Sequence, residues 1–91
     1  MSKAPQQTTI DGFPRTAKQE RQINLLAVST FGTAPGREFL SYLRSISIES
    51  VGGPHISTEE LRFREGCRYF CYLIEQRVAQ GHKEKQNAES T

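Results

Sequence analysis

The chain has 91 residues, of which only 35% are hydrophobic, and its 12 basic and 10 acidic side chains give a formal net charge of +2. This length allows one small domain with a thin core, and so mild a positive charge does not by itself indicate nucleic-acid binding. The chain has no run of 18 apolar residues, and residues 1–7 lack the apolar core of a secretory signal, so we expect no membrane span and a cytoplasmic location.

Residues 1–14 are mostly polar or turn-forming, with Ile10 and Phe13 as their large apolar side chains. Such a segment buries too little surface to offset the conformational entropy that it loses on ordering. We therefore expect residues 1–14 to form an extended N-terminal arm that is mobile in the isolated protein. Ile10 and Phe13 are then the anchors that hold the arm in a groove of another chain.

Two helices are predicted in the first half of the chain. The first covers residues 16–29 and stops at Gly32, because its apolar side chains share one face. The second is capped by Thr33 and has Pro35 in its first turn, where the missing N–H has no partner in any case. Its apolar face extends to Ile46, after which alternating apolar and polar residues predict a frayed or extended end.

The longest predicted helix covers residues 57–80, after a Gly-Gly-Pro turn, and its apolar residues recur three and four positions apart. Ser57 and Glu60 have the spacing of a capping box at its start. Gly81 follows the last apolar residue and suits a left-handed C-terminal cap. We therefore expect residues 82–91 to be a polar, solvated C-terminal tail.

These elements predict an all-α protein, either a small helical hairpin or a three-helix bundle, formed by residues 15–81. Gly66 is unusual, because a glycine inside a helix costs about 1 kcal/mol relative to alanine. It either permits the close approach of another helix or is merely tolerated. The residues predicted to pack between helices are Phe39, Leu40, Leu43, Phe63, Gly66, Cys67, Phe70 and Ile74.

No catalytic, cofactor or metal site is predicted. Cys67 and Cys71 lie one turn apart on the apolar face, where a helix holds their Cβ atoms too far apart for a disulfide. A zinc site needs about four ligands, and the only histidines, His55 and His82, are 12 residues before Cys67 and 11 after Cys71. Buried, reduced thiols are therefore favoured over a metal site. The chain also has none of the HExxH, P-loop, GxGxxG or GxSxG motifs.

The polar side of the longest helix mixes arginines, glutamates and tyrosines. Residues 37–80 contain six arginines and six glutamates, a net charge of zero. A balanced surface with Arg and Tyr suits protein contacts better than a phosphate backbone, although a solvated helix face fits equally well. This side carries Arg62, Arg64, Glu65, Arg68, Tyr69, Tyr72, Glu75 and Arg77, and we expect Arg64, Arg68, Tyr69 and Tyr72, with Ile10 and Phe13 of the arm, to contact partners.

Two short segments carry a family resemblance: Phe-Gly-Thr-Ala-Pro-Gly-Arg-Glu-Phe-Leu at residues 31–40 and Phe-Arg-Glu-Gly-Cys-Arg at residues 63–68. They resemble a family of small, podovirus-like tailed-phage proteins that are encoded among the head and tail structural genes. The resemblance covers residues 31–78, and the aromatic run at residues 67–72 departs from the family pattern. The matching positions are Gly36, Arg37, Leu40, Leu43, Phe63, Arg64, Glu65, Gly66 and Arg68.

The resemblance implies a non-enzymatic virion protein. We expect a multi-copy structural or assembly protein that docks near the portal, the head–tail connector or the internal core. Its expected partners are other phage structural proteins and copies of itself, in a position where packaged DNA could lie nearby. Neither a membrane nor a small-molecule substrate is expected. It would reside in the virion, and in the host cytoplasm during assembly.

A small helical regulator or adaptor that binds nucleic acid or a host protein is the alternative. The second and third predicted helices could imitate a helix-turn-helix. Their connection over residues 50–56 is longer than the usual turn of about three or four residues. Glu59 and Glu60 would also repel phosphate at the start of the supposed recognition helix.

Overall fold

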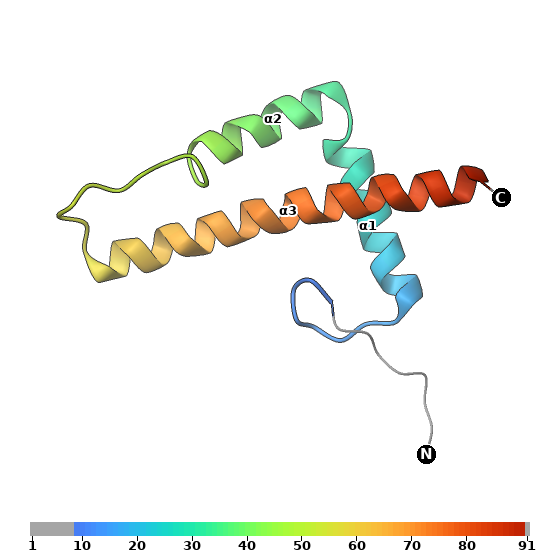
Figure 1. Ribbon diagram of the computed structural model, residues 1–91, viewed down its shortest axis with the longest axis horizontal. Coiled ribbons are helices and arrows are strands. Elements are labelled where there is room, and N and C mark those ends of the chain that lie inside the picture. The colour runs from blue at the N-terminus through green and yellow to red at the C-terminus, as the bar shows by residue number, and fades with distance from the viewer. Residues whose placement is uncertain (1–8, 91) are drawn as a thin grey trace, which may run out of the picture.

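The computed structural model describes residues 9–90, with the side chains of residues 9–88. This part of the chain forms three α-helices and no strand: α1 (Ala17–Phe31), α2 (Ala34–Ser45) and α3 (Thr58–Ser90). Helix α1 crosses the C-terminal half of α3, whereas α2 lies alongside the middle of α3 and the loop after it extends beside the start of α3 (Figure 1). The prediction of an all-α fold with three helices is confirmed. Residues 1–8 of the predicted arm lie outside the described residues.

The ends of α1 and α2 follow from local capping. Thr16 accepts a hydrogen bond from the backbone N–H of Gln19 at 3.1 Å, and the Gln19 side chain accepts one from the Thr16 N–H at 3.0 Å. This capping box was not recognised in the sequence. The predicted stop at Gly32 and the predicted cap at Thr33, which accepts from the Gly36 N–H at 3.2 Å, are both confirmed.

Helix α3 begins where it was predicted to begin but ends later. Ser57 accepts a hydrogen bond from the Glu60 N–H at 3.1 Å, which satisfies one free donor of the first turn. The helix then continues through Gly81 to Ser90. The predicted C-terminal cap at Gly81 is therefore wrong, and residues 82–90 belong to α3 rather than to a separate tail.

Gly81 is buried because α3 crosses α1 at this point. A Cβ atom built on Gly81 would lie 2.7 Å from the Cβ of Val28 and closer still to the carbonyl oxygen of Asn24. A side chain at position 81 would thus push the two helices apart. The roughly 1 kcal/mol that glycine costs inside a helix is offset here by packing against α1, and good helix formers such as Lys, Glu and Gln extend α3 beyond it.

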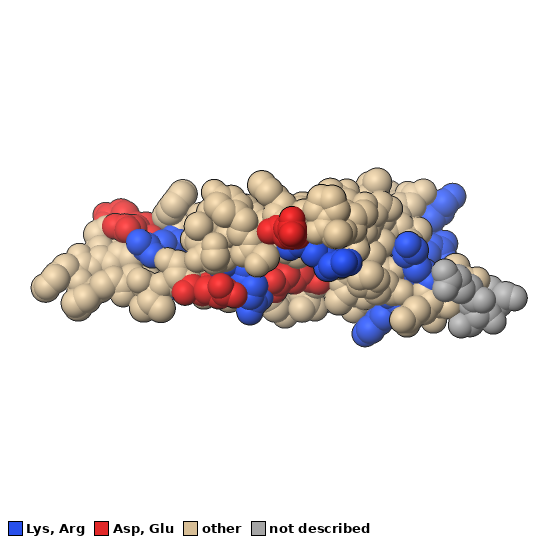
Figure 2. All heavy atoms as spheres, turned by 90° about the horizontal axis from the view of Figure 1, so that it is seen from above, with Lys and Arg blue, Asp and Glu red and all other residues tan. Residues whose placement is uncertain are grey.

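The molecule is a slab with extents of 52 × 40 × 14 Å, which is also evident in the edge view of Figure 2. Helix axes pack about 8–10 Å apart and the Cα radius of a helix is about 2.3 Å, so the slab is at most two helices thick. Val28 and Cys71 are the buried hydrophobic residues of the described chain. The core is accordingly as thin as the composition indicates.

The predicted packing positions divide into two groups. Leu40, Leu43, Cys67 and Ile74 are partly buried. By contrast, Phe39, Phe63 and Phe70 are 56%, 71% and 65% exposed, and a Cβ at Gly66 would meet no atom within 4 Å. The packing prediction is therefore wrong within this chain for these four residues. The close helix crossing occurs at Gly81, because α1 packs against the C-terminal half of α3 and leaves the N-terminal half to the end of α2 and the segment that follows it.

Candidate functional site

A groove runs between the C-terminal end of α2 and the N-terminal half of α3. It consists of two hollows of about 250 and 230 Å³, which adjoin because they share lining residues. We call it the α2–α3 groove. Its lining residues are Leu43, Ile46, Ser47, Ser50, Glu60, Phe63, Arg64, Cys67, Phe70, Cys71 and Ile74.

Large exposed apolar side chains line this groove and continue along α2. Phe39 and Tyr42 of α2 and its C-cap residue Ile46 recur three and four residues apart, so they form one stripe, and each is more than half exposed. Ile46 lines the groove, and Tyr42 and Phe39 continue the stripe along the helix. On α3, Phe63 and Phe70 lie two turns apart on one face. Surface hydrophobic residues scattered singly are normal, but a contiguous apolar patch marks an interaction surface.

The charged groups near the α2–α3 groove are paired within the chain. Arg44 of α2 binds the Glu75 carboxylate of α3 with Nη1 at 2.9 and 2.7 Å from its two oxygens, and it also binds Glu49 at 2.9 Å. Arg64 binds Glu60 at 3.2 Å. The groove is thus an apolar surface with a neutralised polar border, a composition that suits a protein surface better than a phosphate backbone.

Arg64 and Arg68, both in the motif at residues 63–68, hold the segment that connects α2 to α3. Arg68 donates from Nε to the Ser47 carbonyl at 3.1 Å and also bonds to the Ser50 carbonyl. Arg64 donates to the Ser50 hydroxyl at 3.2 Å. The Arg68 bonds satisfy backbone acceptors after α2, where the chain has left helical geometry, and the Arg64 bond holds a side-chain hydroxyl of the same segment. Both side chains therefore have a structural role in addition to any contact with a partner.

The residues predicted to contact partners lie on three separate surfaces. Arg68, Tyr69 and Tyr72 surround a shallow hollow of about 350 Å³ together with Ile48 and Glu65. Arg64 lines the α2–α3 groove instead. The two arm residues, Ile10 and Phe13, lie before α1, and Ile10 lines a different pocket, with Arg77 and Gln80 of the C-terminal half of α3. No single patch brings the six residues together.

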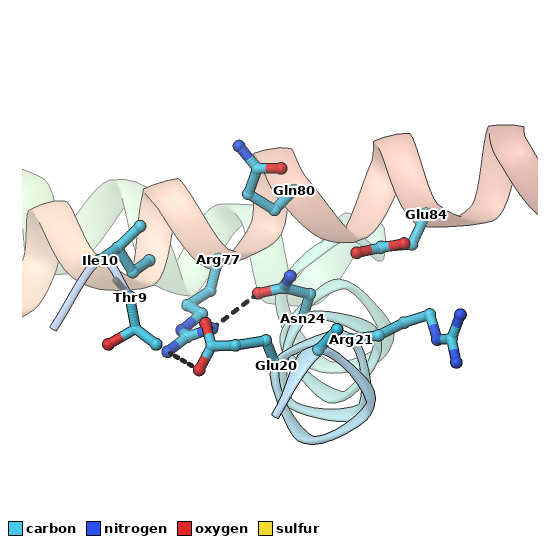
Figure 3. Close-up of a pocket in the computed structure, with 9 residues that line it drawn as sticks. Thr9, Ile10, Glu20, Arg21, Asn24, Arg77, Gln80 and Glu84 are labelled. Atoms are coloured by element: carbon cyan, nitrogen blue, oxygen red, sulfur yellow. Dashed lines mark hydrogen bonds and ion pairs between the residues drawn. The ribbon is translucent and has the colours of Figure 1, made fainter. Parts of the chain in front are cut away.

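The most buried charge is Arg77, at 6% exposed. Its guanidinium donates to Glu20 at 2.6 Å, to the Asn24 side-chain oxygen at 2.9 Å and to Asp11 at 3.2 Å. Figure 3 shows its side chain directed from α3 toward Glu20 and Asn24 of α1. We call Asp11, Arg15, Glu20, Asn24 and Arg77 the Arg77 cluster.

The Arg77 cluster corrects two predictions. Arg77 does not lie on a solvated polar face, since α1 covers it. The described part of the predicted arm, from Thr9 to Phe13, is a turn held against its own chain, in which the buried Thr9 hydroxyl donates to the Phe13 carbonyl at 2.6 Å. Gly12 permits this turn with a φ of 84°, a left-handed conformation that favours glycine.

Electrostatics stabilise the charged forms of the two acids in this cluster. Hydrogen bonds from Arg77 and Arg15 lower the pKa of Glu20, and those from Arg15 and the Phe13 backbone lower the pKa of Asp11 well below its usual range. Two carboxylates face two guanidiniums, so the cluster is neutral and Arg77 is already fully engaged. A pocket of about 290 Å³ adjoins it, but an anionic ligand would have to displace the acids from Arg77.

This cluster was missed because its members are far apart in the sequence: Arg77 lies 57 residues from Glu20 and 66 from Asp11. One local signal was present. Asn24 interrupts an otherwise apolar run between Ile23 and Val28, and a polar side chain on an apolar face needs a buried partner.

Comparisons of the chain with protein-family models, curated proteins and solved structures find no match. Within residues 9–90, no helix combines the length and the apolar character needed to cross a membrane. The same part of the chain holds no group of three or more His, Cys, Asp or Glu side chains arranged to bind a metal ion.

Proposed function

We propose that this protein is a non-enzymatic structural or assembly protein of a phage particle. It is present in many copies and docks near the portal, the head–tail junction or the internal core through protein–protein contacts. The observation that carries the protein-contact part is the α2–α3 groove, where Ile46, Phe63 and Phe70 line the hollows and are each more than half exposed. Phe39 and Tyr42 of α2, also more than half exposed, continue the apolar stripe that ends at Ile46. The phage part is supported by the motifs at residues 31–40 and 63–68.

The contacts that hold the helices together favour a protein-contact function over an enzymatic one. Ion pairs and hydrogen bonds join α1 and α2 to α3, whereas the apolar faces of α2 and α3 are covered only in part, with Phe39, Phe63 and Phe70 exposed. Burying apolar surface gives about 25 cal/mol per Å², so these faces gain free energy when a neighbouring protein covers them. A docked neighbour therefore stabilises the chain as well as the assembly.

The test is retention of the protein in purified particles of the phage that encodes it. We expect the wild-type chain to sediment with intact particles and to stay bound at about 1 M salt, where exposed charges are screened beyond about 3 Å. Phe70→Ser should reduce retention, whereas Leu26→Ser, a control at a residue that is 68% exposed on α1, should not. Circular dichroism of both variants would establish that they remain folded.

DNA binding distinguishes the nucleic-acid alternative. A protein that neutralises several phosphates loses affinity steeply with salt, with a log–log slope close to the number of phosphates contacted. Absence from particles together with salt-sensitive DNA binding would overturn the proposal.

A further inference from the structure

We infer that the α2–α3 groove is covered by a second copy of this chain, in a face-to-face pair related by two-fold symmetry. The inference rests on the proposed function of this groove as a protein-contact surface and names its occupant. An isologous contact requires one patch that carries both projections and hollows. The groove meets this requirement, because Phe63 and Phe70 project beside hollows of about 230 and 250 Å³.

The area available is close to what a stable pair needs. An aromatic side chain contributes about 200 Å² when fully exposed, and four aromatic side chains of this surface are 54–71% exposed. They therefore offer about 490 Å² in total, to which Ile46 adds, against about 800 Å² per partner in a standard interface. The partly exposed lining residues Leu43, Cys67 and Ile74 supply the remainder. The exposed apolar residues of this surface are Phe39, Tyr42, Ile46, Phe63 and Phe70.

Charge favours a copy of the chain over a strongly charged partner. The arginines beside the groove are neutralised by Glu49, Glu60 and Glu75 of the same chain. Two such patches face each other without like-charge repulsion, which would otherwise oppose a symmetric contact. A strongly acidic or basic partner would gain little from these charges, because each is already paired within the chain.

Aromatic residues at the centre of an interface dominate binding, and polar residues at its rim contribute less. Phe63 and Phe70 occupy that central place on α3, one beside each hollow. In the pair, each phenylalanine of one copy enters a hollow of the other. The polar pairs Arg44–Glu75 and Arg64–Glu60 then form the border that excludes water.

The test is sedimentation equilibrium of the purified chain over a range of concentrations. We expect the wild-type protein to sediment at twice the chain mass in the micromolar range and to dissociate on dilution. Phe63→Ser and Phe70→Ser should each weaken the pair at least tenfold while leaving the helical circular dichroism unchanged. Leu26→Ser is the matched control, because it removes an equally exposed apolar side chain from α1 and should leave the dissociation constant within threefold of wild type.

A wild-type chain that stays monomeric at about 100 µM, above the range of ordinary specific affinities, would overturn the inference. Self-association that Leu26→Ser abolishes and the two phenylalanine variants do not would overturn it as well. Failure of the proposed function is a separate result. If the chain is monomeric but Phe70→Ser still loses its place in particles, the groove binds a different protein and the proposed function stands.

Discussion

Replacing Arg77 with methionine tests whether one buried charge holds α1 across α3. Methionine keeps most of the aliphatic stem but removes the guanidinium. That guanidinium side chain is 7% exposed and bonds to Glu20, Asp11 and Asn24. The substitution therefore leaves two carboxylates and an amide oxygen without their shared donor at the helix crossing.

The expected loss follows from the burial of the cluster. Removing one partner of a buried ion pair costs about 3–5 kcal/mol. Glu20 and Asp11 keep Arg15 as a partner, so we expect the lower end, about 3 kcal/mol. A domain of this size has a total stability of about 5–14 kcal/mol at 0.05–0.15 kcal/mol per residue. The change would then remove a large part of the stability of the fold.

Urea unfolding followed by circular dichroism measures this loss, at one fixed protein concentration because any self-association makes stability concentration-dependent. Arg62→Met is the matched control: it makes the same substitution in the same helix at an exposed side chain, where changes stay within about 0.5 kcal/mol. Arg77→Lys should lie between the two, since it restores one charge without the fork of donors. If Arg77→Met costs less than about 1 kcal/mol more than its control, the Arg77 cluster does not hold the crossing.

Three further predictions concern the same elements. Ser57→Ala should cost about 1 kcal/mol by removing the cap of α3, and an unchanged urea midpoint would contradict that role. Gly81→Ala should destabilise the fold through overpacking, by about 1–3 kcal/mol. Gly66→Ala should stabilise it by up to about 1 kcal/mol. If thermal or urea unfolding shows the Gly81 variant to be the more stable of the two, the helix crossing at position 81 is refuted. Finally, Glu20 and Asp11 have a lower pKa in the folded than in the unfolded state, so their stabilisation is complete at neutral pH and decreases as the pH falls below the ordinary values of 4.5 and 3.8. Unfolding measured from pH 7 to pH 2 should show a larger loss for wild type than for Arg77→Met, and identical pH profiles would count against the cluster.

Local signals predicted the helices well. The positions at which α2 and α3 begin, and the stop of α1 at Gly32, depend on side chains within three or four residues of the helix end, which is what a capping argument uses. The start of α1 was predicted from apolar spacing, and its cap at Thr16 was not. The apolar spacing of three and four residues also identified the helical faces of α2 and α3. These features need no knowledge of which elements meet.

The wrong predictions have a common physical cause. In each case, the environment of the residue is set by an element that is distant in the sequence but close in the fold. Gly81 looked like a helix stop, but α1 packs on it and the helix continues. Arg77 looked exposed, but its counter-charges come from residues 11 and 20. Periodicity likewise placed Phe63 and Phe70 on an apolar face without indicating what covers that face. Within the chain it is covered only in part.

Polar contacts between the helices leave apolar side chains exposed for assembly. Arginine bonds join the described helices in addition to the packing of α1 on α3 at Gly81: Arg77 joins α1 to α3, Arg44 joins α2 to α3, and Arg68 holds the connection between them. These bonds fix the relative orientation of the helices, because a planar guanidinium group donates hydrogen bonds only in certain directions. They hold the helices together while Phe39, Phe63 and Phe70 stay exposed. The chain can therefore present a rigid apolar groove that a neighbour covers, so that the hydrophobic contribution missing from its own thin core is gained on association.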